Sequence, residues 1–119
     1  MRSPRSLANE LIWTSASAID WAKGVAMLHA AYTAGDRLAG YDLAVMPQTW
    51  VKDDYALPRA ERIALVTEQA LTGDCLAVLE LAHTFGREVA PEVLREALSL
   101  AAAKGSVEAD ELLAGWFPE

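Results

Sequence analysis

Residues 73–82, GDCLAVLELA, decide the fold, because their pattern occurs twice more in the chain. Residues 35–44 read GDRLAGYDLA and residues 105–114 read GSVEADELLA. All three copies keep a glycine, an aspartate or serine after it, then an alanine, and then a leucine–alanine pair at fixed distances. The copies start 38 and 32 residues apart, and such separations are typical of helical-repeat proteins. We therefore expect repeated pairs of helices.

Each residue type in this frame has a physical role in a turn between two helices. Glycine ends the first helix because it adopts the left-handed conformation that a β-carbon disfavours. The aspartate or serine that follows accepts hydrogen bonds from the free amides of the next helix. Alanine and leucine four residues apart share one face of that helix, and the small alanine lets a neighbouring helix approach. The frame thus predicts three close-packed helix–turn–helix units.

The composition favours helix in the rest of the chain as well. The 119 residues include 23 alanines and 16 leucines but only 17 valines, isoleucines and threonines together, and β-branched residues lose more freedom in a helix. The length fits one helical-repeat domain, 1–119, with capping helices at about 6–34, an irregular connection at about 47–57 and repeats to about 117. We expect an all-α fold, a short stack of antiparallel helix hairpins (an α-α superhelix), with helices near 6–14, 17–34, 36–46, 59–72, 74–85, 91–104 and 106–116.

The clearest copy of the frame resembles a known repeat family. The run Ala70-x-x-Gly73-Asp74-x-x-Ala77-x-x-x-Leu81-Ala82-x-x-Phe85 is similar to the first helix of a Sel-like repeat, a class related to tetratricopeptide repeats. Residues 97–105 resemble its second helix, and residues 106–113 open another unit. The resemblance covers about residues 59–117 and, more weakly, 26–46, although the turn at 86–91 lacks most of the family's glycines. It implies a right-handed stack of helix pairs with a concave protein-binding surface, of the kind found in scaffolds and adaptors.

The charge of the chain restricts its partners. The formal net charge is −7, and residues 59–119 carry eleven acidic but only five basic side chains. Nucleic acids and anionic membranes need a basic surface, so we expect neither, and instead expect a protein partner, one that carries a basic surface. The single cysteine excludes an internal disulfide, and no apolar run is long enough to span a membrane. We expect a cytoplasmic protein.

The sequence offers little for catalysis, and we expect no enzyme, cofactor or metal. It lacks the phosphate-binding, nucleophile-elbow, zinc-protease and dinucleotide motifs. His29 and His83 have no histidine or glutamate at the following helical spacings, and Cys75 is adjacent to an opposing carboxylate, Asp74. The leading hypothesis is a non-catalytic adaptor or scaffold. The alternatives are a small acidic inhibitor or immunity-type protein that blocks a basic toxin or nuclease, and an enzyme or ligand-binding domain with a site near residues 47–57.

Two surfaces are candidates for the contact with a partner. Positions two, six and ten after the first two glycines face away from the alanine–leucine stripe. Together with three edge residues in the 47–57 segment, they form the first candidate surface: Arg37, Tyr41, Val45, Cys75, Leu79, His83, Trp50, Asp53 and Asp54. Packing of Trp50 back over the helices is the competing expectation for that residue.

The second candidate surface lies at the end of the last predicted helix. Leu112, Leu113, Trp116 and Phe117 span too broad an arc for all four to face inward. We expect this end to meet another protein or a second copy, with Trp116 and Phe117 at the contact, so a homodimer is one expected outcome. The alternative is that both rings fold back over the preceding hairpin. At the other end of the chain, the apolar side chains expected to form a cap are Leu7, Leu11, Trp13, Ile19 and Trp21.

Overall fold

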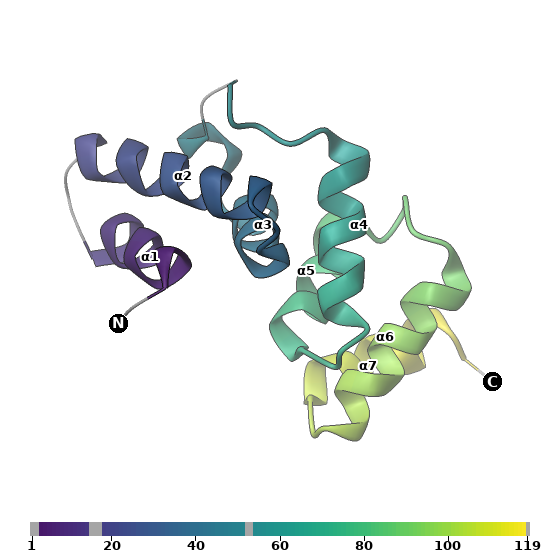
Figure 1. The fold of residues 1–119 in the computed structure, drawn as a ribbon. Helices are drawn as coiled ribbons and strands as arrows, with labels where there is room; N and C mark the ends of the chain where they lie inside the picture. Colours follow the sequence, from purple (N-terminus) through teal and green to yellow (C-terminus); the bar gives the residue numbers. More distant parts are fainter. Residues whose placement is uncertain (1–2, 15–17, 52–53, 119) are drawn as a thin grey trace. The chain divides into compact units, whose positions relative to one another are not determined.

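The regular secondary structure of the described residues is all helical, with no strand. A computed structural model describes residues 3–14, 18–51 and 54–118. Its elements are α1 (Pro4–Thr14), α2 (Ala18–Thr33), α3 (Arg37–Val45), the short 3-10 helix η1 (Gln48–Trp50), α4 (Arg59–Ala70), α5 (Cys75–Phe85), α6 (Pro91–Ala103) and α7 (Val107–Trp116) (Figure 1). Every predicted helix is present, with ends within about two residues of those expected. The all-α fold class is therefore confirmed.

The three glycines of the repeated frame adopt the predicted left-handed conformation. Gly35, Gly73 and Gly105 have φ angles of 109°, 89° and 100°, and no other described residue has a positive φ. A residue with a β-carbon pays a steric penalty there. In the chain each glycine therefore ends one helix and redirects the backbone into the next.

The residue after each glycine caps the helix that follows. One carboxylate oxygen of Asp36 and one of Asp74 each accept two backbone N–H groups from the first turns of α3 and α5, at 3.0–3.3 Å. The hydroxyl of Ser106 accepts the N–H of Ala109 at 3.2 Å in α7. These bonds satisfy amides that have no partner inside the helix, so the predicted caps are confirmed in all three copies.

The alanine and leucine of the frame are buried in the first two copies but only partly in the third. The fully buried pairs are Ala39 with Leu43 in α3 and Ala77 with Leu81 in α5. In α7, Ala109 is fully buried, whereas Leu113 is only half-buried. Because α7 packs against α6 and α5 along one side, the rest of its surface is left to solvent.

The chain divides into two compact units, residues 1–62 and residues 63–119. In the first unit, α2 packs against both α1 and α3. The approach of α1 to α2 depends on Gly24, since a β-carbon there would lie 2.6 Å from Cγ1 of Ile12 and 2.8 Å from the carbonyl oxygen of Ala8. The core of this unit consists of Ala8, Ile12, Val25, Leu28, Ala39, Leu43, Met46 and Val51.

The segment predicted to connect irregularly, 47–57, contains η1 and packs onto the core of the first unit. Val51 is buried, and the half-buried Trp50, Tyr55 and Leu57 lie against the same core. The described residues of the segment therefore contribute apolar side chains to the core of the unit.

Polar contacts add to the apolar core of the first unit. Asp42 of α3 accepts two hydrogen bonds from the guanidinium of Arg5 in α1, at 2.6 and 3.0 Å, and a third from the amide of Asn9 at 3.0 Å. The hydrogen bonds with Asp42 raise the pKa of Arg5 above its ordinary value. The hydroxyl of Tyr32 donates to the carboxylate of Glu61, and this bond raises the pKa of Tyr32.

The buried side chains of the second unit come from α4, α5, α6 and α7, and most of them lie on α5 and α6. The buried side chains of these two helices are Ala77, Val78, Leu81, Ala82, Phe85, Leu94, Ala97, Leu98 and Ala101. The turns that precede α5 and α7 are linked, because Nζ of Lys104 donates to the carbonyl oxygen of Thr72 at 3.1 Å. The link holds two copies of the repeated frame next to each other.

Candidate functional site

Helix α7 leaves more of its surface uncovered than the two helices against which it packs. Ala109 is its one fully buried side chain, whereas α5 buries five side chains and α6 buries four. The exposed fractions of Val107 and Trp116 are 70% and 47%. Val107 and Trp116 lie at opposite ends of α7 and do not form one contiguous patch, which is the feature that marks a binding surface.

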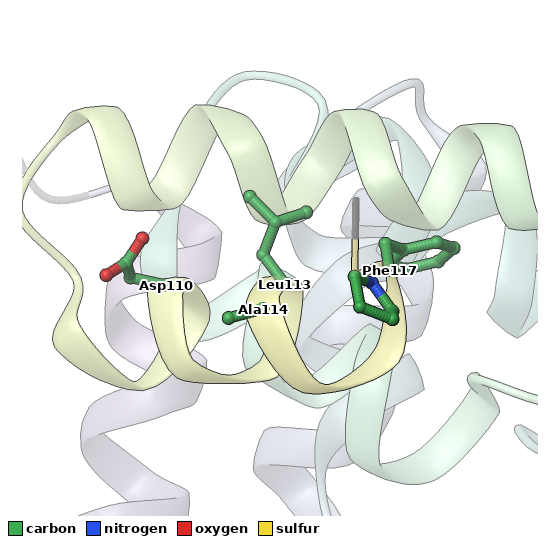
Figure 2. Close-up of a pocket in the computed structure, with 5 residues that line it drawn as sticks. Asp110, Leu113, Ala114 and Phe117 are labelled. Atoms are coloured by element: carbon green, nitrogen blue, oxygen red, sulfur yellow. The ribbon is translucent and has the colours of Figure 1, made fainter.

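An open hollow of about 390 Å³ lies along α7 and the residues that follow it. Its lining consists of Asp110, Leu113, Ala114, Phe117 and Pro118. Leu113 and Ala114 lie three and four residues after Asp110, so these three share one side of α7, and Phe117 and Pro118 directly follow the helix. Figure 2 shows Asp110, Leu113 and Phe117 in a row along α7. The volume is near the lower end of the roughly 300–1,000 Å³ typical of ligand clefts.

The electrostatic character of this part of the chain is acidic. Residues 105–119 contain four acidic side chains and no basic one. Glu108 forms an exposed pair with His83 of α5, at 2.9 Å. The Asp110 carboxylate has no hydrogen bond or ion pair with any residue in the described ranges. The hollow thus combines an apolar wall with an exposed carboxylate in the first turn of α7, a combination that suits a ligand with both apolar and cationic parts.

The predicted contact residues of α3 differ in exposure. Arg37 is exposed, and its guanidinium carbon lies 5.8 Å from the centre of the Tyr32 ring. Tyr41 and Val45 are half-buried. Of these three positions, only Arg37 presents a largely exposed side chain.

Trp50 takes part in a cluster of three tryptophans in the first unit. Its ring stacks on that of Trp21, with centres 5.3 Å apart and planes inclined by 14°, and it lies at a tilt to Trp13 at 5.4 Å. Trp50 is half-buried, whereas Trp13 is 59% exposed. Trp50 therefore packs back over the helices, which is what the competing expectation for this residue predicts. Of the two acidic neighbours predicted as edge residues, Asp54 is exposed and Asp53 lies outside the described residues.

The predicted contact residues of the second unit also differ in exposure. Leu79 is half-buried, and His83 is exposed and paired with Glu108. Trp116 is exposed, and Phe117 is half-buried in the lining of the hollow. Trp116 therefore does not fold fully back over the preceding hairpin.

Sequence reasoning missed several residues of the hollow. Asp110, Ala114 and Pro118 are not among the residues that the sequence predicts to contact a partner. The signal that points to them is the spacing of Asp110, Ala114 and Pro118, four residues apart, beside Leu113 and Phe117 at the same spacing. The exposure of Trp13 was also missed, since this residue was expected to form part of a cap.

Within residues 3–14, 18–51 and 54–118, no group of three histidine, cysteine or acidic side chains is arranged to hold a metal ion. The ring of His29 lies 5.1 Å from that of Tyr55, and Sγ of Cys75 lies 3.8 Å from the carbonyl oxygen of Gly73.

Comparisons of the chain with family models, with curated proteins and with solved structures gave no match. Among the helices described, none has the length and the apolar character that a membrane-spanning helix requires.

Proposed function

We propose that this chain is a non-catalytic protein-interaction module, of the adaptor or scaffold type, that binds a partner through the surface of α7. The observation that carries the proposal is the exposed side of α7, where Trp116 and the hollow beside Phe117 leave apolar surface accessible. Tryptophan is enriched among the residues that contribute most to protein–protein binding. The expected partner is a protein with a basic surface, and the cytoplasm is the expected location of the chain.

The repeated frame supports this proposal through the architecture. Left-handed glycines, capped helices and buried alanine–leucine pairs are the physical requirements of a stack of helix hairpins. We assign the chain to this architecture as a divergent relative of Sel-like repeats, whose members act by binding other proteins. In such stacks, each helix pair buries its apolar face against its neighbours, and the outer helix presents a surface for a partner.

The acidic charge favours a second candidate function, that of an inhibitor of a basic toxin or nuclease. Residues 59–119 have an excess of six acidic side chains. Opposite charge on a partner accelerates encounter and makes it sensitive to salt. An inhibitor would cover the active site of its target, so the purified chain would abolish the target's activity, whereas an adaptor would leave the activity of its partner unchanged.

The proposal is tested by affinity capture from a lysate of the native host with three forms of the protein. Wild type is expected to retain a partner that the double variant Trp116→Ala, Phe117→Ala loses. The matched control is Trp13→Ala, which removes an exposed tryptophan from the first unit and should leave capture intact. Equal capture by all three forms would show that α7 is not the contact surface, and no specific capture by wild type would contradict the interaction module itself.

A separate measurement tests the absence of an enzyme or ligand site. A ligand that binds only the native state raises the melting temperature by mass action. We expect no metal ion or nucleotide to do so. Reproducible stabilisation by one compound would favour an enzyme or ligand-binding domain instead.

A further inference from the structure

We infer that the hollow on α7 binds a lysine or arginine side chain of a basic protein partner. The inference rests on the proposed function and adds the chemistry of the contact. In this arrangement, the carboxylate of Asp110 pairs with the cationic head group, and the apolar wall formed by Leu113, Ala114 and Phe117 covers the aliphatic stem.

The lining matches the two parts of a basic side chain. Lysine and arginine bury their methylene stems against apolar surface while the charged head remains at the edge. The hollow has a corresponding order, since Asp110 lies at one end of the row shown in Figure 2, with Leu113 and then Phe117 further along α7. An apolar ligand would make no use of the carboxylate, which is exposed to water, and an anion would be repelled by it. A side chain with an apolar stem and a cationic end satisfies both parts of the hollow.

Charge also decides between a basic partner and a second copy of this helix. Residues 105–119 carry no basic side chain, so two copies of α7 placed face to face would bring carboxylates together with no cation between them. Like charges that meet across an interface oppose association. The charge of the helix therefore favours a different protein, with lysine or arginine at the contact, over a homodimer through α7.

The inference is tested by nuclear magnetic resonance on the ¹⁵N-labelled full chain, with a peptide of six arginines as the probe. A peptide of six citrullines is the control, because citrulline keeps the length and polarity of arginine without its charge. We expect the arginine peptide to shift the amide signals of residues 110–117 in a saturable manner, and the citrulline peptide to leave them unchanged. Equal shifts with both peptides, or no shifts at these residues, would overturn the inference.

Two variants separate a specific ion pair from the general attraction of an acidic protein. Asp110→Asn and Glu111→Gln each remove one negative charge from α7 while keeping the size of the side chain, but only Asp110 lines the hollow. We expect Asp110→Asn to weaken the binding of the arginine peptide about three- to fivefold, near the upper limit for an exposed pair, and Glu111→Gln to change it less than about twofold. An equal loss in both variants would show non-specific charge attraction and would overturn the inference.

Self-association and the proposed function are distinguished by two further outcomes. Shifts in the amide signals of residues 110–117 that appear on raising the protein concentration alone would assign the hollow to a second copy, against the inference. If the arginine peptide fails to bind but capture of a partner still depends on Trp116 and Phe117, the proposed function stands and the cationic contact is wrong. If capture fails as well, both are wrong.

Discussion

Replacement of Gly24 by alanine is expected to destabilise the first unit, although alanine is the better helix former. In an exposed helix, the change from glycine to alanine stabilises by about 1 kcal/mol. At position 24, however, the new β-carbon would lie 2.8 Å from the carbonyl oxygen of Ala8 and 2.6 Å from Cγ1 of Ile12. The isoleucine side chain can change its rotamer, but the carbonyl belongs to the backbone of α1 and moves only if the two helices separate.

The magnitude follows from the balance of these two effects. Overpacking of a well-packed contact costs about 1–3 kcal/mol, and the clash with a backbone atom places Gly24→Ala at the upper part of this range. After the gain in helix propensity is subtracted, we expect the free energy of unfolding to fall by about 1–2 kcal/mol. For a chain of this size, the melting temperature should fall by about 4–8 °C.

The assay is urea and thermal unfolding followed by tryptophan fluorescence and by circular dichroism. Three of the four tryptophans belong to the first unit, so fluorescence reports mainly on the unit that carries the substitution. Gly115→Ala is the matched control, because it lies in helix α7 and its β-carbon would meet no atom within 4 Å. It should stabilise by about 0.5–1 kcal/mol. If Gly24→Ala were as stable as wild type or more stable, the close approach of α1 and α2 would be refuted.

Three further predictions concern a turn, a polar network and a pH response. Gly105→Ala should lower the free energy of unfolding by about 1–2 kcal/mol, because its φ of 100° is strained for any residue with a β-carbon; an unchanged urea midpoint would contradict this. Asp42→Ala should cost about 1–3 kcal/mol in the same assay, since it leaves the guanidinium of Arg5 without its carboxylate; no loss of stability would show that the network is dispensable. The hydrogen bond to Glu61 raises the pKa of Tyr32 above 10.0, so its contribution to stability is complete below pH 10 and is lost as the pH rises through the higher value in the folded state. Absorbance at the tyrosinate band should accordingly show one of the three tyrosines titrating late, and Tyr32→Phe should remove that late phase; persistence of the phase would assign it to another tyrosine.

The local features of the fold could be predicted because their causes lie within a few residues of sequence. Gly73 and Asp74 specify a helix end and a helix start through the backbone conformation of one and the hydrogen bonds of the other. Neither effect depends on the rest of the chain. The same argument holds at Gly35 and Gly105. For this reason the predicted helix ends lie within about two residues of the observed ones.

The packing between distant segments could not be predicted in the same way. The stacking of Trp50 on Trp21 joins residues 29 positions apart, and no periodicity within the 47–57 segment specifies that contact. The close approach at Gly24 likewise depends on the path of α1, which its own sequence does not determine. Tertiary packing, and not local preference, sets both features.

The candidate site was predicted in part. The exposure of Trp116 follows from the broad apolar arc at the end of α7, which a single neighbouring surface cannot cover. The hollow itself was not predicted. It forms where α6 and α5 leave part of α7 open, and Asp110 lines it because of its position relative to Leu113 and Phe117. An acidic residue on an exposed helix is by itself indistinguishable from a solvated charge.

The central claim, that α7 is the contact surface for a protein partner, is tested most directly by site-specific photo-crosslinking. A photoreactive phenylalanine analogue is placed at position 116 and, in a control protein, at Ser99, an exposed position on α6 of the same unit. Both proteins are irradiated in a lysate of the native host, and the adducts are identified by mass spectrometry. We predict that position 116 gives one dominant adduct, with a basic segment of another protein, and that position 99 gives none. The absence of an adduct at position 116, or the same adducts at both positions, would contradict the claim.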